Sequence, residues 1–429
     1  MDTVCPQELH RLASALELSG DVLAKPTFSS DNGRFSGGVG NQHEAKSGDS
    51  TKANGPGNSI NMEIAQGLKR VLFGSRPFLF CDEWSRSHLQ WQHQRGQFPY
   101  GLFCPKDKSR GIVMVIQAHI LKHLLFDNMD SQDNREQISS AMQVKPSELE
   151  RRNTIISSLA DILWRAGNAT KAVVVIQHGS MLGPTRSELR RLEHLVSTLR
   201  TLEYNSYDQL WTCLKKRIDQ FTNHEGGGIL LFLYSLILSR SINKVENDLQ
   251  GDTLLTHTDQ CALPLISLTL TGSATPYLFN GDLVYDIKGQ PLPEPLRGIK
   301  ERCEIGLLLV ERNRLLSKDK KQVGSMLKTP IFPIWITYLN GRYSILFCLN
   351  GNLNRDWRIE HCFTLHYFNG QSEQTKETKL TVDSRMCSFE AAPTISKHSE
   401  EKTIPLVEEC ILTRWSGAKV NWNGSLPLV

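Results

Sequence analysis

The sequence lacks the features that most quickly assign a protein to a class. Its 429 residues carry 49 Lys and Arg against 45 Asp and Glu, which leaves a net charge of only +4. Nucleic-acid-binding proteins usually show a strongly basic domain or stripe. The longest apolar run, residues 229–238, is half the length of about 20 residues that a membrane-spanning helix needs. We therefore expect neither a nucleic acid nor a membrane as a partner.

The cysteines and the N-terminus also lack recognisable patterns. None of the 10 cysteines forms a CxxC pair, and the N-terminus has acidic residues without the apolar segment of a secretory signal. Scattered cysteines of this kind are typical of reduced thiols, not of a disulfide framework or a zinc site. The expectation is an intracellular, cytoplasmic protein that is not secreted and that holds no metal and no cofactor.

The first 60 residues differ in composition from the rest of the chain. Gly and Ser supply 13 of the 33 positions between 28 and 60, and large apolar side chains are few. Such a stretch cannot bury enough apolar surface to offset the entropy of ordering it. We predict a mostly disordered N-terminal segment with a Gly/Ser-rich linker at 1–60, a folded domain at 61–425 and a short tail at 426–429.

Hydrophobic periodicity predicts a largely helical first half. Apolar residues recur at helical spacing in several segments, and one short β-branched run, residues 172–177, is typical of a buried strand. The predicted helices are 62–73, 111–126, 136–166 with a break at Pro146, 187–204, 207–222 and 228–240.

The last third changes to short strands separated by turns. Asn-Gly pairs, which favour tight hairpin turns, stand at 340–341, 350–351 and 369–370. They separate four predicted strands at 331–338, 342–349, 362–368 and 379–383. A helical half followed by an antiparallel meander predicts an α+β fold.

Two local patterns invite a functional interpretation. His119 and His123 stand four residues apart on a predicted helix and would share a face, but a metalloprotease motif needs Glu at position 120, which is Ile, and no third ligand is evident. The polar loop 100–110 delivers Arg110 to the start of the helix 111–126. In thiol hydrolases a helix N-terminus stabilises the attacking thiolate.

The loop and several later blocks resemble the MINDY family of deubiquitinases, cysteine peptidases that trim lysine-linked ubiquitin chains, and most of all its fourth-type branch. The expected family motif, Tyr-Gly-Leu-Val-Gln-Lys-Lys-Gly-Gly-Pro-Cys-Gly-Val-Leu-Ala-Ala-Val-Gln, matches at Tyr100, Gly101, Leu102, Lys106, Gly111 and Gln117. Further similar blocks lie at 160–167, 270–280, 304–306, 323–336, 343–347 and 420–424. The resemblance implies a papain-like cysteine-peptidase scaffold.

The departures from the motif fall on the chemistry. The resemblance places the nucleophilic Cys at Arg110, the general-base His at Arg342 and the oxyanion-stabilising Gln at Cys104. A guanidinium group stays protonated at biological pH, so Arg110 cannot attack a carbonyl and Arg342 cannot accept a proton. Cys104 has no amide N–H for an oxyanion, and losing one such donor costs about two to three orders of magnitude in rate.

The residues therefore predict an inactive ubiquitin carboxyl-terminal hydrolase that retains ubiquitin or partner binding. Two arginines at the former Cys–His positions would either diverge, sealing the site, or bind an anion between them, with Asp107 as an internal candidate. One alternative is a weakly active enzyme using Cys104, which His361 or His366 would approach. Another alternative is a scaffold without ubiquitin binding.

Overall fold

The computed structural model describes residues 57–106, 108–127, 141, 144–177, 192–224, 227–286, 288–312, 322–385 and 404–426. The contacts divide the chain into two units, Met1–Ser50 and Thr51–Val429, and every described residue lies in the second. The described residues begin at Gly57, four positions before the predicted start of the folded domain at 61. The predicted disorder of residues 1–56 and the tail 427–429 lie outside the described residues.

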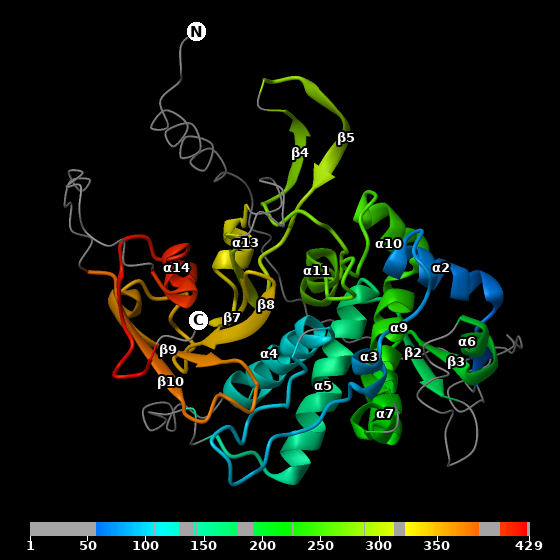
Figure 1. Ribbon diagram of the computed structural model, residues 1–429, viewed down its shortest axis with the longest axis horizontal. Helices are drawn as coiled ribbons and strands as arrows, with labels where there is room; N and C mark the ends of the chain where they lie inside the picture. The colour runs from blue at the N-terminus through cyan, green and yellow to red at the C-terminus, as the bar shows by residue number, and fades with distance from the viewer. Residues whose placement is uncertain are drawn as a thin grey trace, which may run out of the picture. The chain divides into compact units, whose positions relative to one another are not determined.

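The first helices cluster around a common apolar core (Figure 1). The central pair is α4 (Arg110–Phe126) and α5 (Glu148–Ala166), and α9 (Gly228–Arg240) and α11 (Leu263–Thr271) pack against α5. Both α4 and α9 are apolar around nearly their whole circumference, as expected of helices that neighbours cover on every side. The remaining helices of this half are α2 (Met62–Phe73), α3 (Asp82–Arg86), α6 (Leu192–Thr198), α7 (Tyr207–Arg217), α8 (Asp219–Thr222) and α10 (Ile242–Leu249).

Most predicted helices are confirmed, and one prediction is partly wrong. Residues 136–140 lie outside the described residues, and the helix after Pro146 begins at Glu148. The predicted helix 187–204 ends at Thr198, because residues 199–204 form strand β3 (Leu199–Tyr204). This strand pairs antiparallel with β2 (Ala172–Gln177) and with β1 (Asn58–Ser59). The lone strand predicted at 172–177 needed a partner for its backbone hydrogen bonds, and residues 199–204 supply it.

The C-terminal third forms a six-stranded sheet in the order β11-β10-β9-β8-β7-β6. The predicted meander is confirmed, since β7 to β11 pair antiparallel in sequence order. The Asn340-Gly341 turn has positive φ at both positions (46° and 88°), as a tight hairpin turn requires. The prediction missed β6, which pairs parallel with β7. The strands are β6 (Gly306–Val310), β7 (Ile334–Leu339), β8 (Arg342–Phe347), β9 (Cys362–Phe368), β10 (Thr378–Asp383) and β11 (Lys419–Asn421).

Helices and strands meet where α4 packs against β7 and β8. The helix α14 (Leu406–Leu412) packs on the same sheet at β6 and β7. In the chain between α11 and β6, the strands β4 (Asp282–Tyr285) and β5 (Pro291–Arg297) form a hairpin, which is a separate two-stranded sheet. The short elements α13 (Ser325–Lys328) and η5 (Ile359–His361) complete the described chain. The mixed helix-and-sheet class is confirmed, while the papain-like scaffold stays a prediction.

Among the described residues, no single helix is long and apolar enough to cross a membrane. The bent pair α9 and α10 reaches that length and composition only as two pieces at 86° to each other.

Candidate functional site

The start of α4 lies at the junction of the helical half and the large sheet. Gly111 permits this approach, because a Cβ there would meet Cys261 Cβ at 2.8 Å, Ile266 Cδ1 at 2.9 Å and Tyr343 Cε2 at 3.0 Å. The Tyr343 hydroxyl donates a hydrogen bond to the carbonyl oxygen of Cys261 (3.0 Å). The glycine that matches the family motif therefore holds the first turn of α4 against α11 and β8.

Arg110 occupies this first turn with its side chain turned into the protein. Only 5% of the residue is exposed. Its guanidinium group donates to three carbonyl oxygens from three segments: Nε to Tyr343 (2.6 Å), one terminal nitrogen to Pro105 (3.1 Å) and the other to Asn369 (2.7 Å). Among the described residues, no carboxylate pairs with Arg110. At the position where the resemblance places the nucleophile, the Arg110 side chain therefore links the loop, β8 and the segment after β9 through hydrogen bonds.

Arg342 lies next to Tyr343 at the start of β8, but it is exposed. The two arginines are close enough to affect a common neighbour: burial raises the pKa of Tyr367, and Arg110 and Arg342 both oppose that rise. Arg110 is buried against carbonyl oxygens while Arg342 is exposed, so the two side chains lie in different environments. The anion candidate Asp107 lies outside the described residues.

Cys104 lies in the same region, and its backbone N–H donates to the carbonyl of Gly370 (3.0 Å). A Cβ on Gly370 would lie 2.8 Å from the Cys104 sulfur, so the two segments are in close contact. Burial raises the pKa of the Cys104 thiol to about 12, although the Arg110 guanidinium opposes this rise. The structure therefore brings together the segments that carry Cys104, Arg110 and Arg342, and it keeps the thiol protonated.

The histidines considered as partners for Cys104 interact elsewhere. His366 Nδ1 hydrogen-bonds the Glu377 carboxylate (2.9 Å), and the ring stacks on that of Phe347, with the ring centroids 5.2 Å apart. His361 packs edge-on against Trp357. Neither contact directs an imidazole toward the thiol.

Gln117 supports the loop from inside. Its side-chain oxygen accepts a hydrogen bond from the N–H of Leu102 (2.6 Å), and its amide nitrogen donates to the carbonyl of Tyr100 (3.0 Å). These two contacts fix the backbone of the Tyr-Gly-Leu segment that the resemblance highlights. Since Gln117 is fully buried, it acts on the position of the loop and not on a bound molecule.

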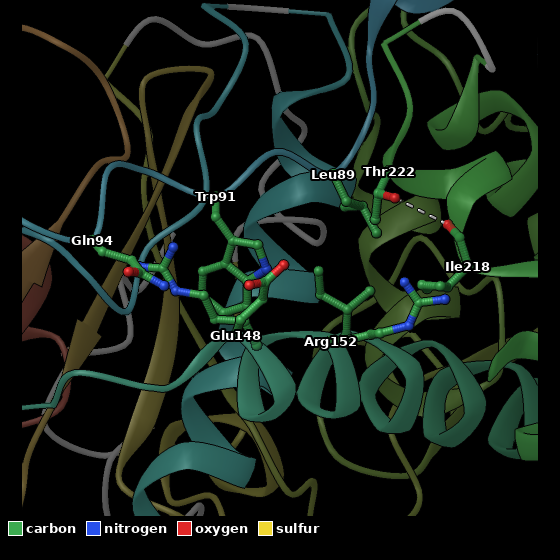
Figure 2. Close-up of a pocket in the computed structure, with 9 residues that line it drawn as sticks. Leu89, Trp91, Gln94, Glu148, Arg152, Ile218 and Thr222 are labelled. Carbon is green, nitrogen blue, oxygen red and sulfur yellow. Dashed lines mark hydrogen bonds between the residues drawn. The ribbon is translucent and has the colours of Figure 1, made fainter.

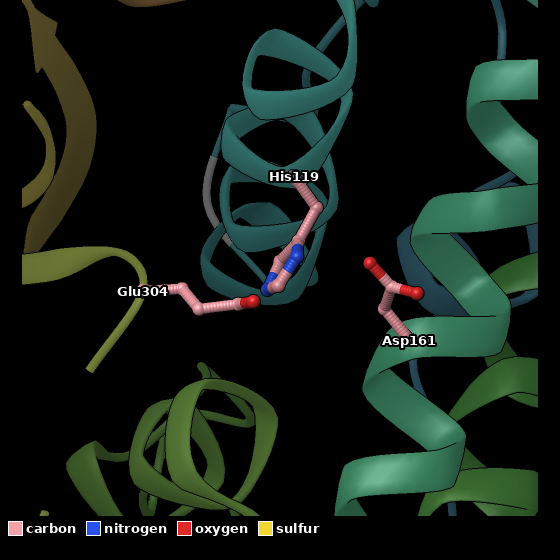
Figure 3. Close-up of side chains that lie close together, drawn as sticks. All are labelled: His119, Asp161 and Glu304. Atoms are coloured by element: carbon pink, nitrogen blue, oxygen red, sulfur yellow. The ribbon is translucent and has the colours of Figure 1, made fainter. Parts of the chain in front are cut away.

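A second polar cluster lies further along α4. Ligand atoms of His119, Asp161 and Glu304 lie within 4.8 Å of one another, and Figure 3 shows the three side chains converging from α4, α5 and the loop before β6. The sequence alone offered no third metal ligand beside the two histidines. The fold supplies two carboxylates, which are 42 and 185 positions from His119 in the chain.

Cations of the protein already neutralise these carboxylates. Lys122 Nζ lies 2.6 Å from Asp161 and 3.4 Å from Glu304, and Arg165 also pairs with Glu304. Burial, with the charges of Arg165 and Lys122, holds the pKa of His119 well below its usual value. A divalent cation would add charge to a partly buried cluster whose carboxylates already face cations of the protein. We therefore assign these residues as an internal ion-pair network.

A groove of about 370 Å³ lies beside the loop that carries Trp91 (Figure 2). Its walls are Trp91, Leu89 and residues of α5 and of the α7–α8 junction. The Arg151 guanidinium lies 4.9 Å from the Trp91 ring centroid and donates to the carbonyls of Gln92 and Pro99. The residues that line the groove include no thiol and no histidine, the two groups that a cysteine peptidase uses.

Comparison with known proteins identifies the chain's relatives. The sequence matches the family described as "Deubiquitinating enzyme MINDY-3/4, conserved domain" over residues 69–424. The human "Probable ubiquitin carboxyl-terminal hydrolase MINDY-4" is 35% identical over 374 residues, which cover 86% of this chain and 46% of the relative. The mouse protein of the same name is also 35% identical, over 86% of this chain and 47% of the relative.

A more distant relative is the bovine "Ubiquitin carboxyl-terminal hydrolase MINDY-3", 28% identical over 266 residues, or 55% of this chain and 54% of the relative. No solved structure matches the chain significantly. The chain spans about half the length of the curated MINDY-4 relatives that it matches. The match over most of this chain confirms the resemblance seen in the motifs, and the chain belongs to the MINDY-3/4 family of deubiquitinating enzymes.

Proposed function

We propose that this chain is a pseudo-deubiquitinase, which binds polyubiquitin of the degradative lysine-linked type without hydrolysing it. The observation that carries the proposal is Arg110 at the position where the family resemblance places the nucleophile. A guanidinium has no free electron pair at biological pH and cannot form the acyl intermediate of a thiol hydrolase. The exposed Arg342, at the position of the general base, cannot take up a proton for the same reason.

The geometry supports the sealed version of the site over an anion-binding version. The three carbonyls of Pro105, Tyr343 and Asn369 engage the guanidinium of Arg110 from different segments. A bound anion would have to break these contacts and compete with the dipoles that already satisfy the buried cation. The papain-like scaffold and the intracellular location belong to the same proposal.

The relocated-thiol alternative has less support. Burial raises the pKa of the Cys104 thiol to about 12, which disfavours the thiolate, the reactive form, at neutral pH. The activation that a catalytic cysteine receives from a neighbouring imidazole is not present in the described contacts of His361 and His366.

The decisive measurement is a hydrolysis assay on purified full chain with lysine-linked tetraubiquitin, run beside the Cys104→Ala variant. We expect no cleavage by either protein and no covalent adduct with a ubiquitin-based electrophilic probe. Cleavage by the wild type that disappears in Cys104→Ala would establish the relocated-thiol enzyme. Cleavage that persists in both after rigorous purification would also contradict the proposal.

Binding is measured separately by titrating the chain with mono-, di- and tetraubiquitin. Affinity that rises with chain length supports a ubiquitin-binding pseudoenzyme. An absence of binding at about 100 µM tetraubiquitin, a level at which even weak specific contacts register, would favour the scaffold without ubiquitin binding. The double variant Arg110→Ala, Arg342→Ala tests whether the former site contributes, and we expect an unchanged affinity.

A further inference from the structure

The β4–β5 hairpin carries the most concentrated apolar exposure in the described chain. Three consecutive residues of β4 are exposed although they are large and hydrophobic: Leu283 by 44%, Val284 by 43% and Tyr285 by 59%. Single exposed apolar residues are ordinary, but a contiguous run on a strand marks a contact surface. A two-stranded sheet alone is also only marginally stable in water.

The two edges of the hairpin differ. On β5, the Gln250 side chain closes the outer edge: its amide nitrogen donates to the carbonyl of Pro295 (2.8 Å), and its oxygen accepts from the N–H of Arg297 (3.4 Å). Prolines at 291, 293 and 295 further remove N–H donors from this strand. The strand β5 is therefore protected against pairing with another strand.

In the described part of the chain, the outer edge of β4 has neither a closing side chain nor a proline, although the strand is short and begins with Asp282. The strand, Asp-Leu-Val-Tyr, contains no proline and no lysine, and within the described residues it pairs only with β5. Arg297 directs its N–H to Gln250, away from β4, so Asp282, its cross-strand partner, directs its own backbone groups away from β5. This edge combines free backbone groups with exposed apolar side chains.

We propose that the outer edge of β4 pairs antiparallel with the same strand of a second copy of this chain. Centred on Leu283, such a pair places each Asp282 opposite Val284 of the other copy and each Leu283 opposite itself, so no like charges face each other. Centred on Val284, it would place Asp282 opposite Asp286, which is unfavourable. Self-complementarity in one register is what a two-fold symmetric interface requires.

Charge at this edge does not oppose the pairing. The Asp282 carboxylate is already paired with Lys300 Nζ at 3.0 Å, so it approaches the second copy without a bare negative charge. The register shift in the hairpin between Leu283 and Tyr285 limits regular pairing to a few residues. The dimer is accordingly weak, as expected of an interface below the standard size of about 1,600 Å².

The first test is sedimentation velocity on the full chain at concentrations from about 1 µM to about 100 µM, which covers weak association. The wild type shifts from its mass of 48.4 kDa toward twice that mass as concentration rises. Leu283→Lys weakens association about tenfold or more, because a lysine on an edge strand opposes pairing with another strand. The matched control is Leu149→Lys, which changes another exposed leucine (67%) and leaves association unchanged.

The second test fixes the register. A Leu283→Cys variant forms an intermolecular disulfide between the two copies of residue 283 under mild oxidation, identified by mass spectrometry of the linked peptide. The control Val284→Cys crosslinks far less, because its copies lie diagonally, about 7–8 Å apart, beyond the reach of a disulfide. A wild type that stays monomeric throughout, equal weakening by both lysine variants, or faster crosslinking at 284 would each overturn the proposal.

Discussion

The helix α4 passes two buried charged regions that are satisfied in opposite ways. At its first turn, Arg110 donates only to carbonyl oxygens among the described residues. About three turns later, Lys122 lies between two carboxylates, Asp161 and Glu304. Carbonyls orient a cation and satisfy its donors without cancelling its charge, whereas carboxylates cancel it. The loss of one carboxylate therefore leaves an excess positive charge in the second region, whereas the loss of Arg110 leaves no charge behind in the first.

The largest expected effect is the loss of Asp161. The variant Asp161→Asn keeps the shape of the side chain but removes the charge that faces Lys122 and His123. Breaking a buried ion pair on one side costs about 3–5 kcal/mol of the free energy of unfolding. Urea denaturation measures it. The control Asp219→Asn removes a surface partner of Arg152 and costs under about 1 kcal/mol; equal losses in both would contradict the comparison.

The loss of Arg110 is expected to cost less. Arg110→Met removes three hydrogen bonds and leaves three carbonyls to rearrange, but it leaves no opposite charge behind. We expect about 2–3 kcal/mol of destabilisation in urea. Arg110→Lys should recover only part of this loss, because one ammonium cannot reproduce the fork of donors that reaches three segments. A loss above that of Asp161→Asn would reverse the ranking of the two regions.

Sequence patterns predicted the part of the fold that is encoded locally. The helix at 111–126 follows from its apolar length, and the hairpin at 340–341 follows from Asn-Gly, whose two residues adopt positive φ. The strand at 199–204 was predicted as a helix because its pairing with β2 is a tertiary contact that no local pattern records. Parallel strand β6 was missed for the same reason.

The candidate site was predictable only in part. The positions of Arg110, Arg342 and Cys104 came from the family resemblance, whose assignment of roles to them stays a prediction. The contacts that Arg110 makes join residues 233 and 259 positions away, so no spacing rule could supply them. The ion-pair network was hidden for the same reason, since Lys122 and Glu304 are 182 residues apart.

The pH dependence of stability sharpens the description of the network. Burial lowers the pKa of His123, but its hydrogen bonds with Asp127 and Asp161 outweigh this, and the net pKa is raised. Stability from protonated His123 is therefore complete below the unfolded-state pKa of about 6.5 and is lost as pH rises through the higher folded-state pKa. Lys122, which also faces His123, opposes its protonation and limits the effect.

We expect the wild type to lose more unfolding free energy between about pH 6 and about pH 8.5 than His123→Gln, because only the wild type releases this proton. The exposed His93→Gln variant is the control and should keep the wild-type slope. In acid the sign is opposite: the network holds the pKa of Asp161 well below its usual value, so its contribution is lost as pH falls from about 4. Parallel slopes in all three proteins would argue against the assigned protonation of His123.

The smallest expected effect is at Arg342, although the resemblance places a catalytic role at Arg342 as well as at Arg110. Because Arg342 is exposed and Arg110 is buried, Arg342→Ala should change the free energy of unfolding by less than about 0.5 kcal/mol. Arg342→His should be equally neutral and should not restore hydrolysis, since the nucleophile position still holds a guanidinium. A loss at Arg342 as large as that of Arg110→Met would show that both arginines, and not one, stabilise this part of the structure.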